Sequence, residues 1–297
     1  MFLVLGNAVV DEAMTADAWP APGQTVVVGA PRRDLGGKGA NQALMLARAG
    51  APVRFVAPVG RDPDGDWIAD TLRHAGLPQA ELWRTGGATD RSLIFVSREG
   101  ENAIASTTEA ARSIDAVAAA ALVQGLEPGD VLVLQGNLTL ATTCSALEAA
   151  RSRRVRTVFN PSPIQAGFGE LLGLVDLLVL NEPEAAALSG GAAGDEAAAA
   201  LRSAGAGAVV LTLGGRGAVF VSEAGHGHVP ARAVKVVDTT GAGDTFAGVL
   251  TAAFYQRDLS LAAAIRAATE AATLTVQRPG TLAAFPSADE VAAIWRR

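Results

Sequence analysis

Cysteine, histidine, lysine and tyrosine are scarce in this sequence. Its 297 residues include one cysteine, three histidines, two lysines and one tyrosine. The single cysteine, Cys144, cannot form an internal disulfide, and its alanine-rich surroundings favour a small packing residue over a nucleophile. With so few His and Cys side chains, a zinc site is not expected. A site for Mg²⁺ remains open, because that ion takes oxygen ligands from carboxylates and phosphates.

The sequence carries no excess of positive charge and no long apolar run. Lys and Arg number 24 against 30 Asp and Glu, which gives a formal net charge of −6 and a pI of about 5.2. This balance argues against nucleic acid or an anionic membrane as a partner. Membrane spans need roughly 20 consecutive apolar residues, which no window supplies. Residues 1–5 are apolar but are stopped by Gly6, so we expect a first buried strand rather than a signal peptide, and a cytoplasmic protein.

Short apolar runs alternate with alanine-rich stretches along the whole chain. The runs are nearly continuous in apolar residues, as in strands buried on both faces of a parallel sheet, and span residues 2–5, 53–57, 131–134, 155–159, 177–180 and 208–213. The stretches rich in helix formers span 40–49, 116–124, 142–152 and 197–204. The alternation predicts a single α/β domain over residues 1–297, with a doubly wound, mostly parallel sheet and helices on both faces.

Two segments, 24–29 and 91–104, break this rhythm and are richer in β-branched and polar residues. In the second, residues 92–97 and 102–104 have the pattern of a hairpin whose turn is 98–101. We expect a small antiparallel β lid over one edge of the domain, formed by about 12–30 and 88–105. An ordinary extension of the main sheet is the alternative.

Residues 238–248 read Asp-Thr-Thr-Gly-Ala-Gly-Asp-Thr-Phe-Ala-Gly and are the most informative stretch. An apolar run at 234–237 precedes them and helical spacing over 245–255 follows, which predicts a strand, a glycine turn and a helix start. Gly241 and Gly243 would let backbone N–H groups gather at the positive end of the helix as an anion cradle. Asp244 could accept the proton of a hydroxyl that attacks a phosphate. An Asp that only stabilises the helix dipole is the alternative.

Small and polar residues recur where the predicted strands end. They are Asn7, Asp11, Gln135, Asn137, Asn160, Asn181, Glu184, Gly214 and Gly217. In an open parallel sheet, ligands bind beyond the carboxyl ends of the strands, so the recurrence indicates a binding cleft at that edge. Asn181 and Glu184 also have the spacing of a capping box, a structural device, and both interpretations can hold at once.

Residues 36–41, Gly-Gly-Lys-Gly-Ala-Asn, form a second glycine cluster before a helix. They match neither the P-loop nor the dinucleotide-binding pattern, which disfavours a dehydrogenase. Lys38 could contact a phosphate or sugar hydroxyls, since its ammonium is compact. A solvated turn charge at Lys38 and a helix cap at Asn41 are the alternatives.

Together, the clusters at 36–43 and 238–248 resemble the two signatures of the ribokinase / phosphofructokinase-B family of carbohydrate kinases. The resemblance covers nearly the whole chain in order and spacing. It includes segments 22–25, 60–62, 99–102, 160–163, 181–184 and 212–217.

The resemblance implies ATP-dependent phosphorylation of a hydroxymethyl group on a sugar or sugar-like molecule. Asp244 would be the catalytic base, and the backbone N–H groups of Gly241, Ala242 and Gly243 would form the anion hole. The residues implied for the substrate are Asp11, Gly37, Lys38, Asn41 and Asn137. Those implied for the nucleotide are Asn181, Thr212, Gly214 and Gly217, with Glu184 near Mg²⁺. The residues implied for a monovalent cation, K⁺, are Asp238, Thr240, Thr275 and Gly280. A lid that pairs with its copy would make a homodimer.

Two positions depart from ribokinases. Val9 stands where these have Asn, and Asn137 stands where they have Glu. Both positions would touch the sugar, so the sequence leaves the substrate open. Arg91 near the lid could face an acidic substrate or be exposed. A nucleoside or sugar-acid kinase of the same family is one alternative function. A non-catalytic sugar or nucleotide sensor is another, although such a protein would be expected to lose Asp244 or the glycines.

Overall fold

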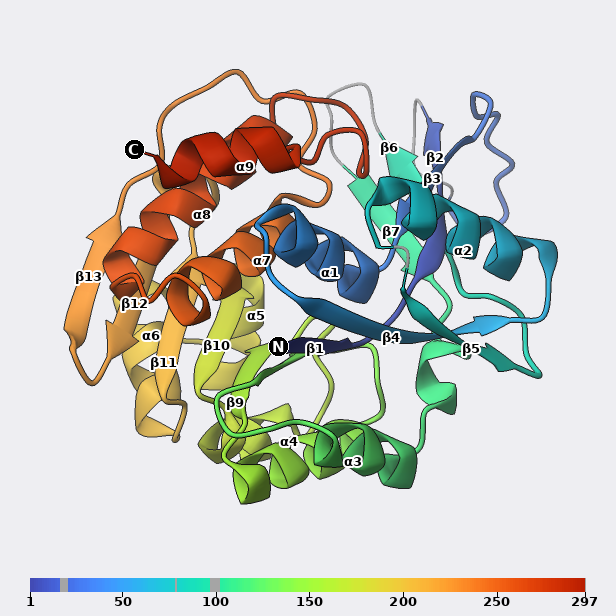
Figure 1. Ribbon diagram of the computed structural model, residues 1–297. Helices are drawn as coiled ribbons and strands as arrows, with labels where there is room; N and C mark the ends of the chain where they lie inside the picture. Colours follow the sequence, from blue (N-terminus) through green and yellow to red (C-terminus); the bar gives the residue numbers. More distant parts are fainter. Residues whose placement is uncertain (17–20, 78, 97–101, 297) are drawn as a thin grey trace.

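The computed structural model describes residues 1–16, 21–77, 79–96 and 102–296, and contains one large sheet with helices on both faces (Figure 1). The strand order in this sheet is β13-β12-β11-β10-β9-β8-β1-β4-β5. The strands are β1 (Phe2–Leu5), β4 (Val53–Gly60), β5 (Glu81–Thr85), β8 (Val131–Gln135), β9 (Arg156–Asn160), β10 (Leu177–Asn181), β11 (Ala208–Thr212), β12 (Ala218–Ser222) and β13 (Gly225–Val229).

The large sheet is parallel from β5 to β11, and β12 and β13 are antiparallel at one edge. The predicted doubly wound, mostly parallel sheet is therefore confirmed. Because the parallel strands share a direction, their carboxyl ends lie along one edge, where the predicted polar residues follow.

Two apolar cores lie on the two faces of the sheet. In β1, Phe2 and Val4 pack into one core, while Leu3 and Leu5 pack into the other, as the period of two in a strand requires. The helices of the first face are α1 (Lys38–Arg48), α2 (Pro63–Ala75), α7 (Ala242–Tyr255), α8 (Leu261–Thr275) and α9 (Ala288–Trp295). Those of the second face are α3 (Ala116–Gln124), α4 (Leu140–Arg153), α5 (Glu182–Ser189) and α6 (Gly194–Ser203). Short 3-10 helices are η1 (Ala111–Ser113), η2 (Phe168–Leu174) and η3 (Gly214–Arg216).

A second, four-stranded sheet has the order β3-β2-β6-β7 and lies beside α1 and α2 (Figure 1). Its strands are β2 (Val9–Thr15), β3 (Arg32–Gly36), β6 (Arg91–Val96) and β7 (Asn102–Ser106). The pairs β2–β3 and β6–β7 are antiparallel, which confirms the expected hairpin, and β2 runs parallel to β6. The predicted turn at 98–101 lies outside the described residues.

Two predicted extended segments are not strands. Residues 24–29 have no strand, and the flanking β2 and β3 supply the second sheet instead. Residues 234–237 also form no strand, and Val236 and Val237 are exposed. The apolar run was misleading because Val234 and Val236 line a cavity rather than fill the core.

Among the described residues, none of the helices combines the length and apolarity that crossing a membrane requires. Cys144 is partly buried in α4 and packs against the second core, as its alanine-rich surroundings predict.

Candidate active site

The carboxyl ends of the central strands bring the predicted polar residues together. Gln135 pairs with Asn160 at the ends of β8 and β9, and Asn181 pairs with Thr212 at the ends of β10 and β11. The connection from β1 to β2 crosses this edge at residues 6–8, so the site lies where the two sheets meet.

Asp244 lies in the first turn of α7 and is buried, with 5% of its surface exposed. Its Oδ2 accepts a hydrogen bond from Asn41 Nδ2 at 2.9 Å, and its Oδ1 accepts one from Gln42 Nε2 at 3.1 Å. Lys38 Nζ lies 4.0 Å from Oδ1. Helix α1 thus brings the Gly36–Asn41 cluster against the 238–248 motif, and the two signatures form one site.

The turn before α7 has free backbone donors. Gly241 adopts φ 73°, a left-handed conformation that favours glycine, and helix α7 starts at the next residue. Among the described residues, the N–H groups of Gly241 and Gly243 have no hydrogen-bond partner, whereas the N–H of Ala242 donates to the Thr239 carbonyl at 3.2 Å. A Cβ at Gly243 would meet nothing within 4 Å, so an anion could approach this backbone closely.

Asp11, near the start of β2, is buried and lies close to Asp244. Burial raises the pKa of its carboxyl to about 7, a bond from Ser92 acts in the opposite direction, and the nearby Asp34 and Asp244 raise the pKa further. Gly36 lies against this carboxyl, because a Cβ there would come within 2.2 Å of Asp11 Cγ. The glycine therefore makes room for the buried Asp11 carboxyl.

The start of α1, at Gly37 and Lys38, packs against the backbone that connects β1 to β2. Gly37 has φ 96°, and a Cβ there would lie 2.8 Å from the Asn7 carbonyl oxygen. Gly39 N donates to Asn7 Oδ1 at 3.2 Å, which joins the helix start to the end of β1. Arg91 is exposed and pairs with Glu12 and Asp64 on the second sheet and α2, which favours the interpretation of a surface arginine.

Three side-chain amides, Gln42, Gln135 and Asn160, also join this site. The sequence analysis placed Gln135 and Asn160 at the expected cleft without giving them a role, and gave Gln42 none. Gln42 Nε2 also donates to Asn160 Oδ1 at 3.1 Å, and Gln42 Oε1 accepts from Gln135 Nε2 at 3.0 Å. The available signal was weak. Gln135 and Asn160 end predicted strands, and Gln42 follows Asn41 in the first signature, but one sequence cannot show that side chains 202 residues apart meet.

Three buried amide oxygens in this region have no hydrogen-bond partner among the described residues. They are Asn41 Oδ1, Gln135 Oε1 and Asn137 Oδ1. A buried acceptor without a donor is costly, and a bound water or a ligand hydroxyl could supply the missing hydrogen bond.

The other side of the α7 turn borders a cavity of about 460 Å³, which Gly243, Thr212, Gly214 and Gly217 help to line. Its volume falls within the range of small-molecule sites, and much of its lining is apolar. The hydroxyl of Thr269, also in the lining, is a buried group without a hydrogen-bond partner among the described residues. The cavity therefore fits an apolar ring with polar edges, such as a nucleobase.

Asn181 and Glu184 form the capping box that their spacing predicts. Glu184 N donates to Asn181 Oδ1 at 2.9 Å, and Asn181 N donates to Glu184 Oε2 at 3.0 Å. Neither residue lines the 460 Å³ cavity, although Asn181 is the register partner of Thr212, which does. Their place at the nucleotide remains a prediction.

The four residues predicted for a monovalent cation lie around one loop. Asp238 accepts bonds from Thr240 N and Gly280 N, each at 2.9 Å. Burial raises the pKa of Asp238, but these N–H groups outweigh it and hold the pKa below its ordinary value. The buried Thr275 hydroxyl shares a hydrogen bond of 3.0 Å with Thr245, next to Asp244. No group of three His, Cys, Asp or Glu side chains suited to a metal occurs in the part of the chain that the structure describes.

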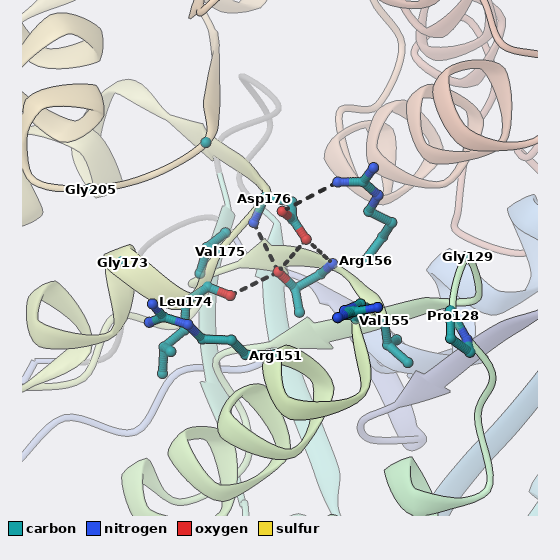
Figure 2. Close-up of a pocket in the computed structure, with 13 residues that line it drawn as sticks. Pro128, Gly129, Arg151, Val155, Arg156, Gly173, Leu174, Val175, Asp176 and Gly205 are labelled. Atoms are coloured by element: carbon teal, nitrogen blue, oxygen red, sulfur yellow. Dashed lines mark hydrogen bonds and ion pairs between the residues drawn. The ribbon is translucent and has the colours of Figure 1, made fainter.

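A larger cavity of about 730 Å³ lies at the opposite, amino ends of the strands (Figure 2). Arg156 and Asp176 approach to 3.9 Å there, and Asp176 Oδ2 accepts a bond from Thr157 N at 2.8 Å. Arg151 is in the last turn of α4, where a cation complements the helix dipole. None of the predicted site residues lines this cavity, and Arg156, Thr157 and Asp176 in its lining interact with one another.

Comparisons with known proteins identify the family and support the fold. Residues 4–288 match the family described as pfkB family carbohydrate kinase. The chain is 33% identical over 296 residues to a ribokinase of Staphylococcus aureus (strain COL), covering 97% of both chains. The crystal structure of a ribokinase from Thermotoga maritima matches with a TM-score of 0.88 and 29% identity, covering 100% of this chain and 99% of that one. An Arabidopsis thaliana ribokinase complexed with ribose and ATP matches with a TM-score of 0.85 and 26% identity, covering 100% and 98%.

Fold, site and relatives together define a phosphotransferase that uses ATP and acts on a sugar hydroxyl. More particularly, the chain belongs to the pfkB family of carbohydrate kinases. Kinases of this family use ATP together with Mg²⁺.

Proposed function

We propose that this enzyme transfers the γ-phosphate of ATP to a hydroxymethyl group of a neutral sugar, with Asp244 as the base. The observation that carries the proposal is the position of Asp244. Its buried carboxylate stands at the start of α7, bonded to Asn41, whose Oδ1 is an unpaired acceptor, and next to Gly243, which lines the 460 Å³ cavity. A hydroxyl bound beside it could reach a phosphate held by the Gly241 and Gly243 N–H groups.

In the proposed reaction, the sugar hydroxyl oxygen forms a bond to the γ-phosphorus while the bond to the bridging oxygen breaks, and ADP leaves with that electron pair. Asp244 accepts the hydroxyl proton. The proton transfer can be late, since the transition state of phosphoryl transfer is loose, and a strong base is not needed. The chain contributes orientation and donors for the developing charge.

The groups of the cleft favour a neutral substrate over a sugar acid. The unpaired atoms there are acceptors, and Asp11 and Asp244 add two carboxyl groups. Lys38 Nζ lies 4.0 Å from Asp244. Hydroxyl donors suit this surface, whereas a substrate carboxylate would face other carboxylates. The relatives named ribokinase support ribose as the first sugar to try, with Val9 and Asn137 setting which hydroxyls are read.

We further propose that Glu184 holds a Mg²⁺–water cluster on the ATP phosphates and that Asn181 lies beside it. The loop of Asp238, Thr240, Thr275 and Gly280 would hold K⁺. The hydrogen bonds that join Asp238 to this loop and Thr275 to Thr245 support the second assignment, since they place the loop next to α7. A cation there would stabilise negative charge on a phosphate at the anion cradle.

We propose that the second sheet is a lid that closes over the sugar and pairs with its copy in a homodimer, in the cytoplasm. Exposed Leu93 on β6 supplies apolar surface for such a contact, and Ile104 on β7 is exposed on the opposite face of the sheet. Sedimentation or light scattering at several protein concentrations tests the dimer, and a monomer at all concentrations would contradict it.

The experiment that tests the function is an ATP-consumption screen over pentoses, hexoses, deoxy sugars, sugar acids and nucleosides, with Mg²⁺ and with or without K⁺. We expect turnover with a neutral sugar and a loss of about 10²–10⁴-fold in kcat for Asp244→Ala, with ATP binding retained. Turnover only with sugar acids would refute the substrate class, and full activity of Asp244→Ala would refute the base.

A further inference from the structure

A chain of three side-chain amides ends on the carboxylate of Asp244. The Nε2 group of Gln42 donates to Asp244 Oδ1 at 3.1 Å and to Asn160 Oδ1 at 3.1 Å. The Oε1 atom of Gln42 accepts from Gln135 Nε2 at 3.0 Å. Asn160 Nδ2 donates to the Val179 carbonyl at 2.9 Å. Both hydrogens of the Gln42 amide are therefore engaged, one of them by the proposed base.

The donor and acceptor orientation of these amides is fixed by the Val179 carbonyl, at the end farthest from Asp244. A backbone carbonyl can only accept, so Val179 obliges Asn160 to present its NH₂ to β10 and its oxygen to Gln42. Gln42 must in turn point its NH₂ group toward Asn160, and the same group then meets Asp244. The orientation of the Gln42 amide thus follows from a strand of the central sheet.

The amides lie in the protein interior. Gln42 is 1% exposed, Gln135 is 0% exposed and Asn160 is 9% exposed. Gly6 leaves the space for one of them, since a Cβ there would come within 2.1 Å of Gln135 Oε1. Apolar side chains could fill the same volume without the cost of burying amides. The retained polar chain therefore points to a task at Asp244.

We propose that Gln42 is a positioning residue for phosphoryl transfer. Its amide, oriented through Asn160, holds one oxygen of Asp244 so that the carboxylate meets the sugar hydroxyl in a single orientation. This inference rests on the proposed role of Asp244 as the base. Gln42 itself need not touch the sugar, so its removal acts on kcat rather than on sugar affinity.

The test compares Gln42→Met with a matched control, Thr157→Val. Methionine keeps the length of the side chain and removes its donors. Thr157 is buried at the opposite end of β9, where its hydroxyl donates to the Leu174 carbonyl at 2.9 Å and does not contact Asp244. We expect kcat of Gln42→Met to fall about 10- to 100-fold, with the KM for sugar and for ATP within about twofold of the wild type. We expect Thr157→Val to lose thermal stability and keep kcat.

A double-mutant cycle separates action through Asp244 from a general effect. In an Asp244→Ala background, Gln42→Met should cause no further loss of kcat, because the group it positions is gone. Asn160→Leu should lower kcat by less than Gln42→Met, since it frees the amide without removing it. Unchanged kcat in Gln42→Met, or equal losses with and without Asp244, would overturn the inference.

Failure of the proposed function gives a different pattern. If Asp244→Ala kept its turnover, the base assignment would fail whatever Gln42→Met did. A crystal structure of Gln42→Met provides a readout independent of turnover. A displaced or split Asp244 carboxylate supports positioning, and an unmoved one contradicts it.

Discussion

The carboxyl group of Asp11 occupies the space that a side chain at Gly36 would need, with Cγ and both oxygens within 2.2 Å of the position of a Cβ. Gly36→Ala should therefore displace Asp11 from the cleft. We expect the KM for sugar to rise at least about tenfold and the free energy of unfolding to fall by about 1–3 kcal/mol. Gly169→Ala is the control, since a Cβ there meets nothing within 4 Å. An unchanged KM would show that Asp11 does not bind the sugar.

The raised pKa of Asp11 predicts two pH effects of known sign. Its pKa is 3.8 in the unfolded reference and about 7 in the folded protein, so between these values only the folded state keeps the proton. Its contribution to stability is full below about pH 4 and is lost as the pH rises to about 7. Asp11→Asn should therefore gain stability relative to the wild type over this window, by at most about 4 kcal/mol, and level off above it. Chemical denaturation at several pH values measures this difference.

Sugar binding should depend on the same titration of Asp11, but it should improve as the pH rises, whereas stability decreases. If hydroxyl groups donate to the ionised Asp11 carboxylate, the KM for sugar falls as the pH rises through about 7. Asp11→Asn should have a higher KM without that inflection. An identical inflection in the variant would assign the titration to another group.

Glu184→Gln separates the capping role of Glu184 from the proposed contact with the Mg²⁺ cluster. Glutamine can maintain the capping box with Asn181, so thermal stability should stay within about 0.5 kcal/mol of the wild type. The loss of charge should raise the Mg²⁺ concentration for half-maximal activity several-fold. Asn181→Ala, by contrast, should cost about 1 kcal/mol of stability through the lost cap. If the Mg²⁺ dependence of Glu184→Gln is unchanged, Glu184 serves the helix alone.

Asp238→Asn tests the cation loop. The amide retains one oxygen for the Thr240 or Gly280 N–H but removes the charge that would attract K⁺. We expect the activation curve for K⁺ to shift to higher concentration, with the KM for sugar little changed at saturating K⁺. If the wild-type enzyme is as active in choline chloride as in KCl, the proposed cation site is contradicted.

Much of the fold could be predicted from the sequence because buried parallel strands and alanine-rich helices leave strong local patterns. The carboxyl-edge cleft and the Asn181–Glu184 capping box followed from similar local rules. The run at 234–237 misled because apolar residues can line a ligand cavity as well as a core. The amide chain of Gln42, Gln135 and Asn160 could not be foreseen, since it depends on three-dimensional contacts between distant segments.

The site combines residues from the first and last quarters of the sequence. Asn41 and Asp244 are 203 residues apart, and Phe285 packs against Gly241, where a Cβ would come within 2.5 Å of its ring. A nascent chain that has emerged only as far as β11 contains most of the large sheet and the glycine cluster of α1, but neither the base nor the anion cradle. Ribosome-bound intermediates should therefore consume no ATP, and C-terminal clipping before residue 285 should silence the enzyme even where the remaining sheet stays folded.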